Sequence, residues 1–313
     1  MSFPYRGENK DLNNAERTSL PGSFIKLADG VTHYELGGLS LTPSPLPMGE
    51  GLEVRVPVVL VHGFSVPYFI WDITFAALTS AGFRVLRYDL FGRGFSDRPR
   101  KKYNMDLFVR QLHELLDELN FQQVSLVGLS MGGPISTAFT VKFPERVRKL
   151  VLIDPVGKQG MPLSWLYKAV FLPGVSELIL GLAGTENMVK GAASDFFDPE
   201  HVAMFQGKYR VQMQYRGFKR AILSTLRSKM VSGHPVIYDQ LGKLSKPVLL
   251  FWGRDDQTLP FEHSADIVAA VPGMEFHPIE DTGHIPHFEK HEIVNPILIN
   301  FLRKNDEKTS TYL

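Results

Sequence analysis

The chain has 313 residues, of which 44% are hydrophobic, enough to build a substantial core in one large domain or two ordinary ones. With 34 basic and 33 acidic residues its formal charge is +1, so no nucleic-acid partner is expected. There is no cysteine, which excludes disulfides, thiolate metal sites and a cysteine nucleophile. Neither a signal-peptide-like run nor 18 consecutive apolar residues occurs, which predicts a cytoplasmic protein with no integral membrane segment.

The first fifty residues predict a surface arm followed by a hairpin. Residues 1–20 are polar, and strand-like segments at 24–27 and 32–36 flank a turn at Asp29-Gly30. Residues 40–51 are dense in proline and glycine, which predicts an exposed excursion and not a domain boundary, because a strand resumes at once.

From residue 54 onward, buried strands alternate with amphipathic helices. The predicted strands cover residues 56–61, 83–88, 124–129, 149–153, 247–252 and 275–279. The predicted helices cover residues 70–81, 106–120, 134–143, 261–270 and 286–301, the second of them capped by Asp106. This alternation predicts a parallel sheet with helices on both faces.

The alternation stops between residues 157 and 233. This stretch contains apolar helical segments at 163–172 and 175–182 and a mixed region at 196–229. Two interpretations are open: the core of a second domain, or a helical cap (lid) whose apolar face forms a substrate pocket. The predicted organisation is an α/β core at 21–156 and 234–303, the insertion at 157–233, and a polar C-terminal tail at 304–313.

A serine stands at the apex of a predicted strand, turn and helix. The apolar run from residue 124 ends in Gly128-Leu-Ser130-Met-Gly132, and a helix follows. Such a turn holds a nucleophile in a strained backbone, with glycines where strand and helix crowd together. The pentapeptide alone is weak evidence, because a Gly/Ser turn can simply end a strand.

Possible partners for Ser130 follow two later strands. Reactive residues of an open parallel sheet sit just beyond the carboxyl ends of strands. Asp255 and Asp256 follow the predicted strand at 247–252, and His284 follows the strand at 275–279. The order serine, acid, histidine is that of a nucleophile, an orienting carboxylate and a general base.

Taken together, these motifs resemble the α/β-hydrolase superfamily, specifically a capped serine hydrolase of the carboxylesterase or monoacylglycerol-lipase kind. The matching signs are His62-Gly63-Phe64, Asp89 with Gly92 and Gly94, Gly128-Leu-Ser130-Met-Gly132, Gly253-x-x-Asp256-x-x-x-Pro260, and Gly283-His284 ahead of Phe288-Glu289. The resemblance implies a mostly parallel eight-stranded sheet and a triad of Ser130, Asp256 and His284. It also implies an oxyanion hole formed by the backbone N–H groups of Phe64 and Met131.

Several neighbouring residues offer alternatives. Asp255 is an alternative acid, although position in the family pattern favours Asp256. His62 is interpreted as a structural hydrogen-bonding residue, and Asp89 and Arg93 as turn-forming. A metal site is not favoured by the other histidines near His284, which are interpreted as part of a surface helix without a role: His277, His287 and His291.

A serine at this turn limits the reaction to acyl transfer, with no cofactor and no metal, and the apolar insertion favours a small hydrophobic ester substrate. The chain also resembles carbon–carbon bond hydrolases of ring-cleavage pathways around Gly253-Arg-Asp-Asp256, but those commonly carry tryptophan where Ile285 stands. Aminopeptidase relatives hold a substrate ammonium with acidic cap residues, and the acids of this insertion show no informative pattern: Glu177, Glu186, Asp195, Asp198 and Glu200. A second class of function is a low-turnover receptor of the same fold that binds a small hydrophobic molecule.

Overall fold

The computed structural model describes residues 5–38, 56–162, 170–172, 174–191, 195–198 and 202–304. The predicted excursion at 40–51, most of the apolar segment at 163–172 and all but the first residue of the predicted tail lie outside these ranges.

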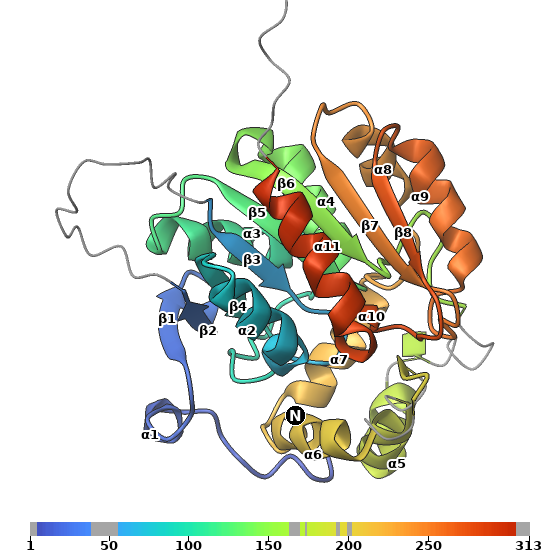
Figure 1. The fold of residues 1–313 in the computed structure, drawn as a ribbon. Coiled ribbons are helices and arrows are strands. Elements are labelled where there is room, and N and C mark those ends of the chain that lie inside the picture. Colours follow the sequence, from blue (N-terminus) through green and yellow to red (C-terminus); the bar gives the residue numbers. More distant parts are fainter. Residues whose placement is uncertain are drawn as a thin grey trace, which may run out of the picture.

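An eight-stranded sheet forms the centre of the molecule, with the order β1-β2-β4-β3-β5-β6-β7-β8 (Figure 1). Its strands are β1 (Ser23–Leu27), β2 (Gly30–Gly37), β3 (Val58–Val61), β4 (Val85–Tyr88), β5 (Val124–Leu129), β6 (Val147–Ile153), β7 (Val248–Gly253) and β8 (Glu275–Ile279). β1 pairs with β2 and β2 with β4 in antiparallel fashion, and every later pairing is parallel. The predicted mostly parallel sheet is confirmed.

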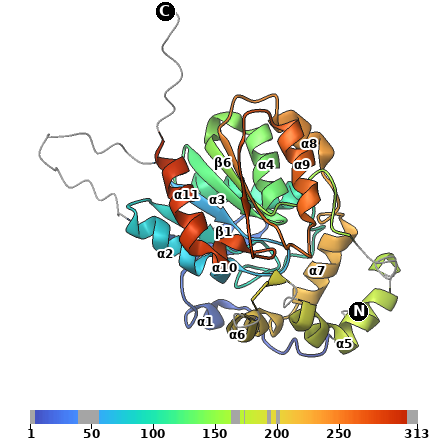
Figure 2. The same ribbon diagram turned by 45° about the vertical axis from the view of Figure 1, so that its right-hand side comes forward.

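Helices cover both faces of the sheet (Figures 1 and 2). One face carries α2 (Asp72–Ser80), which continues the short 3-10 helix η1 (Tyr68–Trp71), together with α10 (Pro286–Glu289) and α11 (His291–Arg303). The other face carries α3 (Met105–Glu118), α4 (Gly132–Lys142), α8 (Pro235–Leu241) and α9 (Ser264–Ala270). Strands β3 and β5 are buried along their whole length, as apolar strands with helices on both sides require.

The start of α3 differs from its prediction. Asp106 lies in the first turn of the helix, where its negative charge interacts favourably with the helix dipole. The N-cap is Asn104, whose side-chain oxygen accepts a hydrogen bond from the amide of Leu107 at 3.1 Å. The prediction that Asp106 caps this helix is therefore wrong, because Asn104, two residues earlier, supplies the same kind of acceptor.

Between β6 and β7 the chain leaves the sheet and forms the inserted helices α5 (Val175–Gly191), α6 (Val202–Met213) and α7 (Phe218–Arg227). They lie beyond the carboxyl ends of the strands (Figures 1 and 2). The mixed region at 196–229 thus contains the two helices α6 and α7. No helix in the described part of the chain is long and apolar enough to cross a membrane.

The N-terminal arm is bound along these inserted helices. The amide of Lys10 donates to the carbonyl of Gln214 at 2.9 Å, and its carbonyl accepts from the amide of Arg216 at the same distance. The carboxylate of Glu8 accepts from the amides of Gly217 and Lys219 at the start of α7, at 2.8 and 2.7 Å. The short helix α1 (Asn14–Arg17) then leads into β1.

Candidate active site

Ser130 occupies a strained turn between β5 and α4. Its φ angle is +52°, in the left-handed region that non-glycine residues seldom adopt. A Cβ at Gly128 would lie 2.5 Å from the carbonyl oxygen of Gly132, and one at Gly132 would lie 2.2 Å from that of Val61. The crowding of strand and helix expected at both glycines is therefore present.

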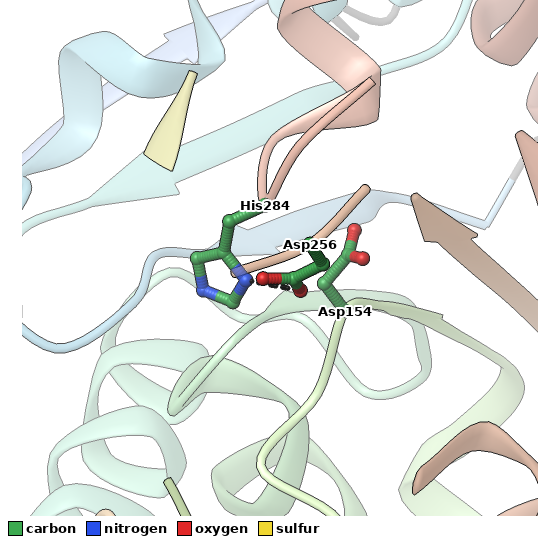
Figure 3. Close-up of side chains that lie close together, drawn as sticks. All are labelled: Asp154, Asp256 and His284. Atoms are coloured by element: carbon green, nitrogen blue, oxygen red, sulfur yellow. Dashed lines mark hydrogen bonds and ion pairs between the residues drawn. The ribbon is translucent and has the colours of Figure 1, made fainter. Parts of the chain in front are cut away.

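A histidine and an aspartate from two later loops meet near this turn. Nδ1 of His284, in the loop after β8, lies 2.7 Å from Oδ2 of Asp256, in the loop after β7 (Figure 3). A carboxylate only accepts, so Nδ1 donates and Nε2 is left as the basic nitrogen. Both residues are almost completely buried, at 4% exposure each.

The acid beside the histidine is Asp256 and not its neighbour. Oδ1 of Asp256 also accepts hydrogen bonds from the amides of Thr258 and Leu259, each at 2.8 Å. Asp255 is exposed at the surface. Three hydrogen bonds therefore fix the Asp256 carboxylate in the orientation that holds the imidazole.

Ser130 and His284 line one cavity of about 220 Å³. In the described residues no hydrogen bond joins the Ser130 hydroxyl to the imidazole, and catalytic hydrogen bonds often form only in the complex with substrate. The remaining described walls are mostly apolar and come from both the strand ends and the insertion, including Val66, Ile70, Met161, Met188, Phe205, Tyr209 and Ile285.

The backbone around the serine suits the expected oxyanion hole. Met131 is the N-cap residue of α4, so its N–H group is not used in a hydrogen bond within the helix. Phe64 lines the cavity on the loop after β3. Phe64 and Ser130, the residue before Met131, both line this cavity, so the two N–H groups belong to segments that border it.

Arg93 does more than form a turn. It is completely buried, and its Nε donates to the carbonyl of Phe64 at 2.8 Å while a terminal nitrogen donates to Oγ1 of Thr225 in α7 at 2.8 Å. Burial lowers the pKa of Arg93 to about 10, so it stays charged at neutral pH. Arg93 thus ties the loop that carries Phe64 to an inserted helix.

His62 has the environment of a structural residue. Its Nε2 accepts a hydrogen bond from the amide of Leu90 at 2.9 Å. Burial lowers the pKa of His62 to about 4, and the nearby Asp89 only partly opposes this. Asp89 itself accepts from the amides of Tyr68 and Phe95, each at 2.9 Å, which fits its expected role in the turn.

A second carboxylate, missed by the sequence reasoning, lies behind Asp256. Asp154, at the carboxyl end of β6, accepts from the amide of Gly253 at 2.8 Å through Oδ1, while its buried Oδ2 has no hydrogen-bond donor in the described residues (Figure 3). Burial, and then the charge of Asp256, raise the pKa of Asp154 well above its ordinary value, because both disfavour a second negative charge at this place. Its position directly after a strand of the sheet is the feature of the sequence that could have marked Asp154 as a candidate.

The predicted surface helix of histidines is wrong. His277 lies in β8 and not in a helix, and its Nε2 contacts Glu275 at 2.9 Å. His287 is completely buried in α10, with its ring 4.5 Å from that of Trp71. Burial lowers the pKa of His287 to about 3, so it remains neutral. Of the three, His291 alone has an exposed side chain.

The environment of His284 predicts the acid limb of a pH profile. Burial lowers the pKa of His284, but Asp256 and Asp195 together outweigh this effect and raise it above its ordinary value. A general base works only when neutral, so kcat/KM should fall as pH decreases through this pKa, with a midpoint above about 6.5. Initial rates on a neutral ester between pH 4 and 9 measure it. A midpoint below pH 6 would contradict this environment.

Among the described residues, one group of side chains could hold a metal ion. Asp154, Asp256 and His284 each offer a ligand atom, and these atoms lie within 4.8 Å of one another. The hydrogen bond from His284 Nδ1 to Asp256 gives these atoms a role without a metal. We therefore expect incubation with EDTA followed by desalting to leave the hydrolytic rate unchanged. A loss of rate that added Zn²⁺ or Mn²⁺ restores would show a metal site instead.

Comparison with known proteins agrees with this architecture. The model of a family described as "Alpha/beta hydrolase family" matches residues 58–296. The chain belongs to the alpha/beta hydrolase family. The Klebsiella pneumoniae protein named 2-hydroxy-6-oxononadienedioate/2-hydroxy-6-oxononatrienedioate hydrolase is 31% identical over 280 residues, which cover 86% of this chain and 93% of that protein.

Solved structures share the alpha/beta hydrolase fold. The meta-cleavage product hydrolase CumD from Pseudomonas fluorescens IP01 superimposes with a TM-score of 0.70 at 24% identity, covering 90% of this chain and 97% of the other. An esterase from Exiguobacterium antarcticum superimposes with a TM-score of 0.73 at 21% identity, covering 91% and 100%. At these identities the likeness concerns the fold alone.

Proposed function

We propose that this protein is a serine hydrolase that cleaves carboxylic esters of apolar acyl groups through an acyl-enzyme. The observation that carries the proposal is the cavity in which Ser130 and the Asp256-bound His284 meet walls that are mostly apolar. A hydroxyl and a base with its orienting acid are what acyl transfer to serine requires, and apolar walls suit an apolar acyl group.

The proposed mechanism starts with proton transfer from the Ser130 hydroxyl to Nε2 of His284 as the oxygen attacks the ester carbonyl. The oxyanion that forms accepts hydrogen bonds from the amides of Phe64 and Met131, each worth about 3 kcal/mol in the transition state. The alcohol leaves with the proton from His284. A water molecule, deprotonated by the same nitrogen, then attacks the acyl-enzyme, and the carboxylic acid departs as Ser130 regains its proton.

The inserted helices fit the role of a cap over this site. Met188, Phe205 and Tyr209 come from the insertion, and they line the cavity opposite the strand ends. We propose that residues 157–233 form this cap and that residues 21–156 and 234–303 form the core. The depth of the apolar pocket, which the insertion helps to form, would then set the preferred length of the acyl chain.

Carbon–carbon bond hydrolysis is the second candidate, because the Klebsiella relative carries that kind of name at 31% identity. A dienedioate brings two carboxylates, which in an apolar site require cationic partners. The described residues that line the cavity include no lysine or arginine, and the acidic Asp195 is among them. This lining favours a neutral ester over a dianion.

The test compares both substrate classes on one preparation. Initial rates would be measured on p-nitrophenyl esters from acetate to laurate and on a 2-hydroxy-6-oxo-dienedioate, with Ser130→Ala protein as the blank. The proposal expects a rate dependent on Ser130 on esters, with an optimum in chain length, and a much lower kcat/KM on the dienedioate. The reverse ranking would establish the second candidate. Stoichiometric binding of esters without any turnover would favour a receptor.

A further inference from the structure

The segment 195–198 of the insertion lies directly against the loop that carries His284. The amide of His284 donates to the carbonyl of Asp195 at 2.9 Å. A Cβ at Gly283 would lie only 2.8 Å from that same carbonyl oxygen, so the two backbones are in close contact. The inserted chain therefore touches the triad histidine through its backbone.

Glu289 adds a second connection between the two segments. Its Oε1 accepts from the amides of Phe197 and Asp198, each at 2.8 Å, and its Oε2 accepts from the hydroxyl of Thr282 and the amide of Gly283, each at 3.0 Å. One carboxylate thus binds the insertion on one side and the histidine loop on the other.

An aromatic anchor holds the same segment in place. The ring of Phe196 is buried between Phe205 of α6 and Phe288 of α10, with centroid separations of 4.9 and 5.9 Å. Both contacts are edge-on, the favourable arrangement for such pairs. The position of segment 195–198 is therefore fixed by packing as well as by hydrogen bonds.

The Asp195 side chain completes a closed ring of hydrogen bonds with the triad. The Thr258 hydroxyl donates to Oδ1 of Asp195 at 2.7 Å, and the Thr258 amide donates to Oδ1 of Asp256 at 2.8 Å. Asp256 holds His284 at 2.7 Å, and the His284 amide returns to the Asp195 carbonyl. The ring contains the acid and the base of the triad, one core threonine and one residue of the insertion.

We propose that Asp195 is a positioning residue of the triad, through which the seating of the insertion on the core orients His284 and Asp256. This inference deepens the proposed serine hydrolysis and rests on it. Asp195 acts on the reaction through Thr258 and His284 and not through the reacting atoms.

Charge supports the same assignment. The ionisable groups around His284 are Asp256, Asp154, Asp195, Glu289 and His287. Asp195 is one of the two carboxylates that raise the pKa of His284, while burial raises the pKa of Asp195 itself and His284 opposes that rise. Such a residue should influence the imidazolium that forms during each turnover.

Two matched sets of variants test the ring. Thr258→Val removes the hydroxyl at constant shape while its amide still reaches Asp256, and Thr258→Ser keeps the hydroxyl. Asp195→Ala removes the carboxylate, and Asp195→Asn keeps an oxygen for Thr258 without the charge. Glu186→Gln is the control, because Glu186 is a solvent-facing carboxylate of the same insertion, paired with Arg210.

The readouts are kcat and KM on one neutral ester, the pH profile of kcat/KM, and the thermal unfolding midpoint. Thr258→Val and Asp195→Ala should lower kcat about tenfold to a hundredfold with KM within about twofold, as misplacement of a catalytic group does. Thr258→Ser and Glu186→Gln should stay close to wild type. Asp195→Asn should move the acid limb to lower pH, because it removes a negative charge beside His284.

The outcomes distinguish failure of the proposed serine hydrolysis from failure of the positioning role of Asp195. If wild-type protein shows no turnover that depends on Ser130, the proposed function fails. If wild-type protein turns over but Thr258→Val, Asp195→Ala and Asp195→Asn all keep its kcat and acid limb, the role of Asp195 alone fails. A change confined to KM would also overturn it and make Asp195 a substrate contact. Should Asp195→Ala prove unfolded, the two Thr258 variants carry the test.

Discussion

Replacing Ser130 with alanine should lower kcat by about 10⁴-fold or more, because the nucleophile and its base act as a unit. The folded structure should persist. Ser130 is held by backbone hydrogen bonds: its amide donates to the carbonyl of Ile153 at 2.9 Å, and its carbonyl accepts from the amides of Gly133 and Val156. Alanine keeps all three, and it meets the same backbone strain as serine at a φ of +52°.

The measurement combines turnover with covalent labelling. A fluorophosphonate reagent should phosphonylate wild-type protein at Ser130, seen by intact mass and peptide mapping, and should not label the Ser130→Ala variant. Thermal unfolding midpoints of the two proteins should agree within a few degrees. Ester hydrolysis that survives in a folded, unlabelled Ser130→Ala protein would show that the nucleophile has been misassigned.

The fold was predictable because the chain carries its signals locally. Apolar runs such as residues 124–129 can be buried on both faces only in a covered parallel sheet, and the helices between them have their own periodicity. The candidates for the proposed triad came from one geometric rule, since Ser130, Asp256 and His284 each come after a strand of that sheet. The choice of Asp256 over Asp255 came from the resemblance to the family pattern. The glycines at 128 and 132 followed from the crowding that the turn imposes.

What the sequence left out depends on contacts between distant segments. Asp195 lies among several acids of the insertion, and only the folding of that insertion onto the core brings it to Thr258 and His284. His287 appeared to belong to a surface helix, yet the four-residue helix α10 is pressed against Trp71. The sequence indicates only a turn at Arg93, because its partner Thr225 lies 132 positions further along the chain.

Asp154 shows how the same rule could have been applied more widely. It follows β6 as directly as Asp256 follows β7, but the family pattern drew attention to the later acid alone. In the structure Asp256 contacts the imidazole directly, and a carboxylate oxygen of Asp154 lies within 4.8 Å of both partners. The effect of replacing Asp256 therefore depends on Asp154 as well.

Replacing Asp256 with asparagine should lower kcat by about 10³- to 10⁴-fold. An amide cannot hold His284 with Nδ1 protonated as a carboxylate does, so the imidazole loses both the orientation and the stabilisation of its charged form. Asp255→Asn is the matched control. Asp255 is exposed, and its substitution should leave kcat within about twofold of wild type.

The neighbouring Asp154 decides how large the loss of activity in Asp256→Asn becomes. Its buried Oδ2 has no donor in the described residues, and its raised pKa reflects burial and the negative charge of Asp256. Once Asp256 is neutral, that repulsion is gone and Asp154 ionises more readily. We therefore expect Asp256→Asn to regain part of its activity as pH rises and the Asp154→Asn/Asp256→Asn double variant to lack this recovery. Equal pH profiles for the single and double variants would show that Asp154 cannot replace Asp256. A large loss in Asp255→Asn would instead move the acid of the triad to position 255.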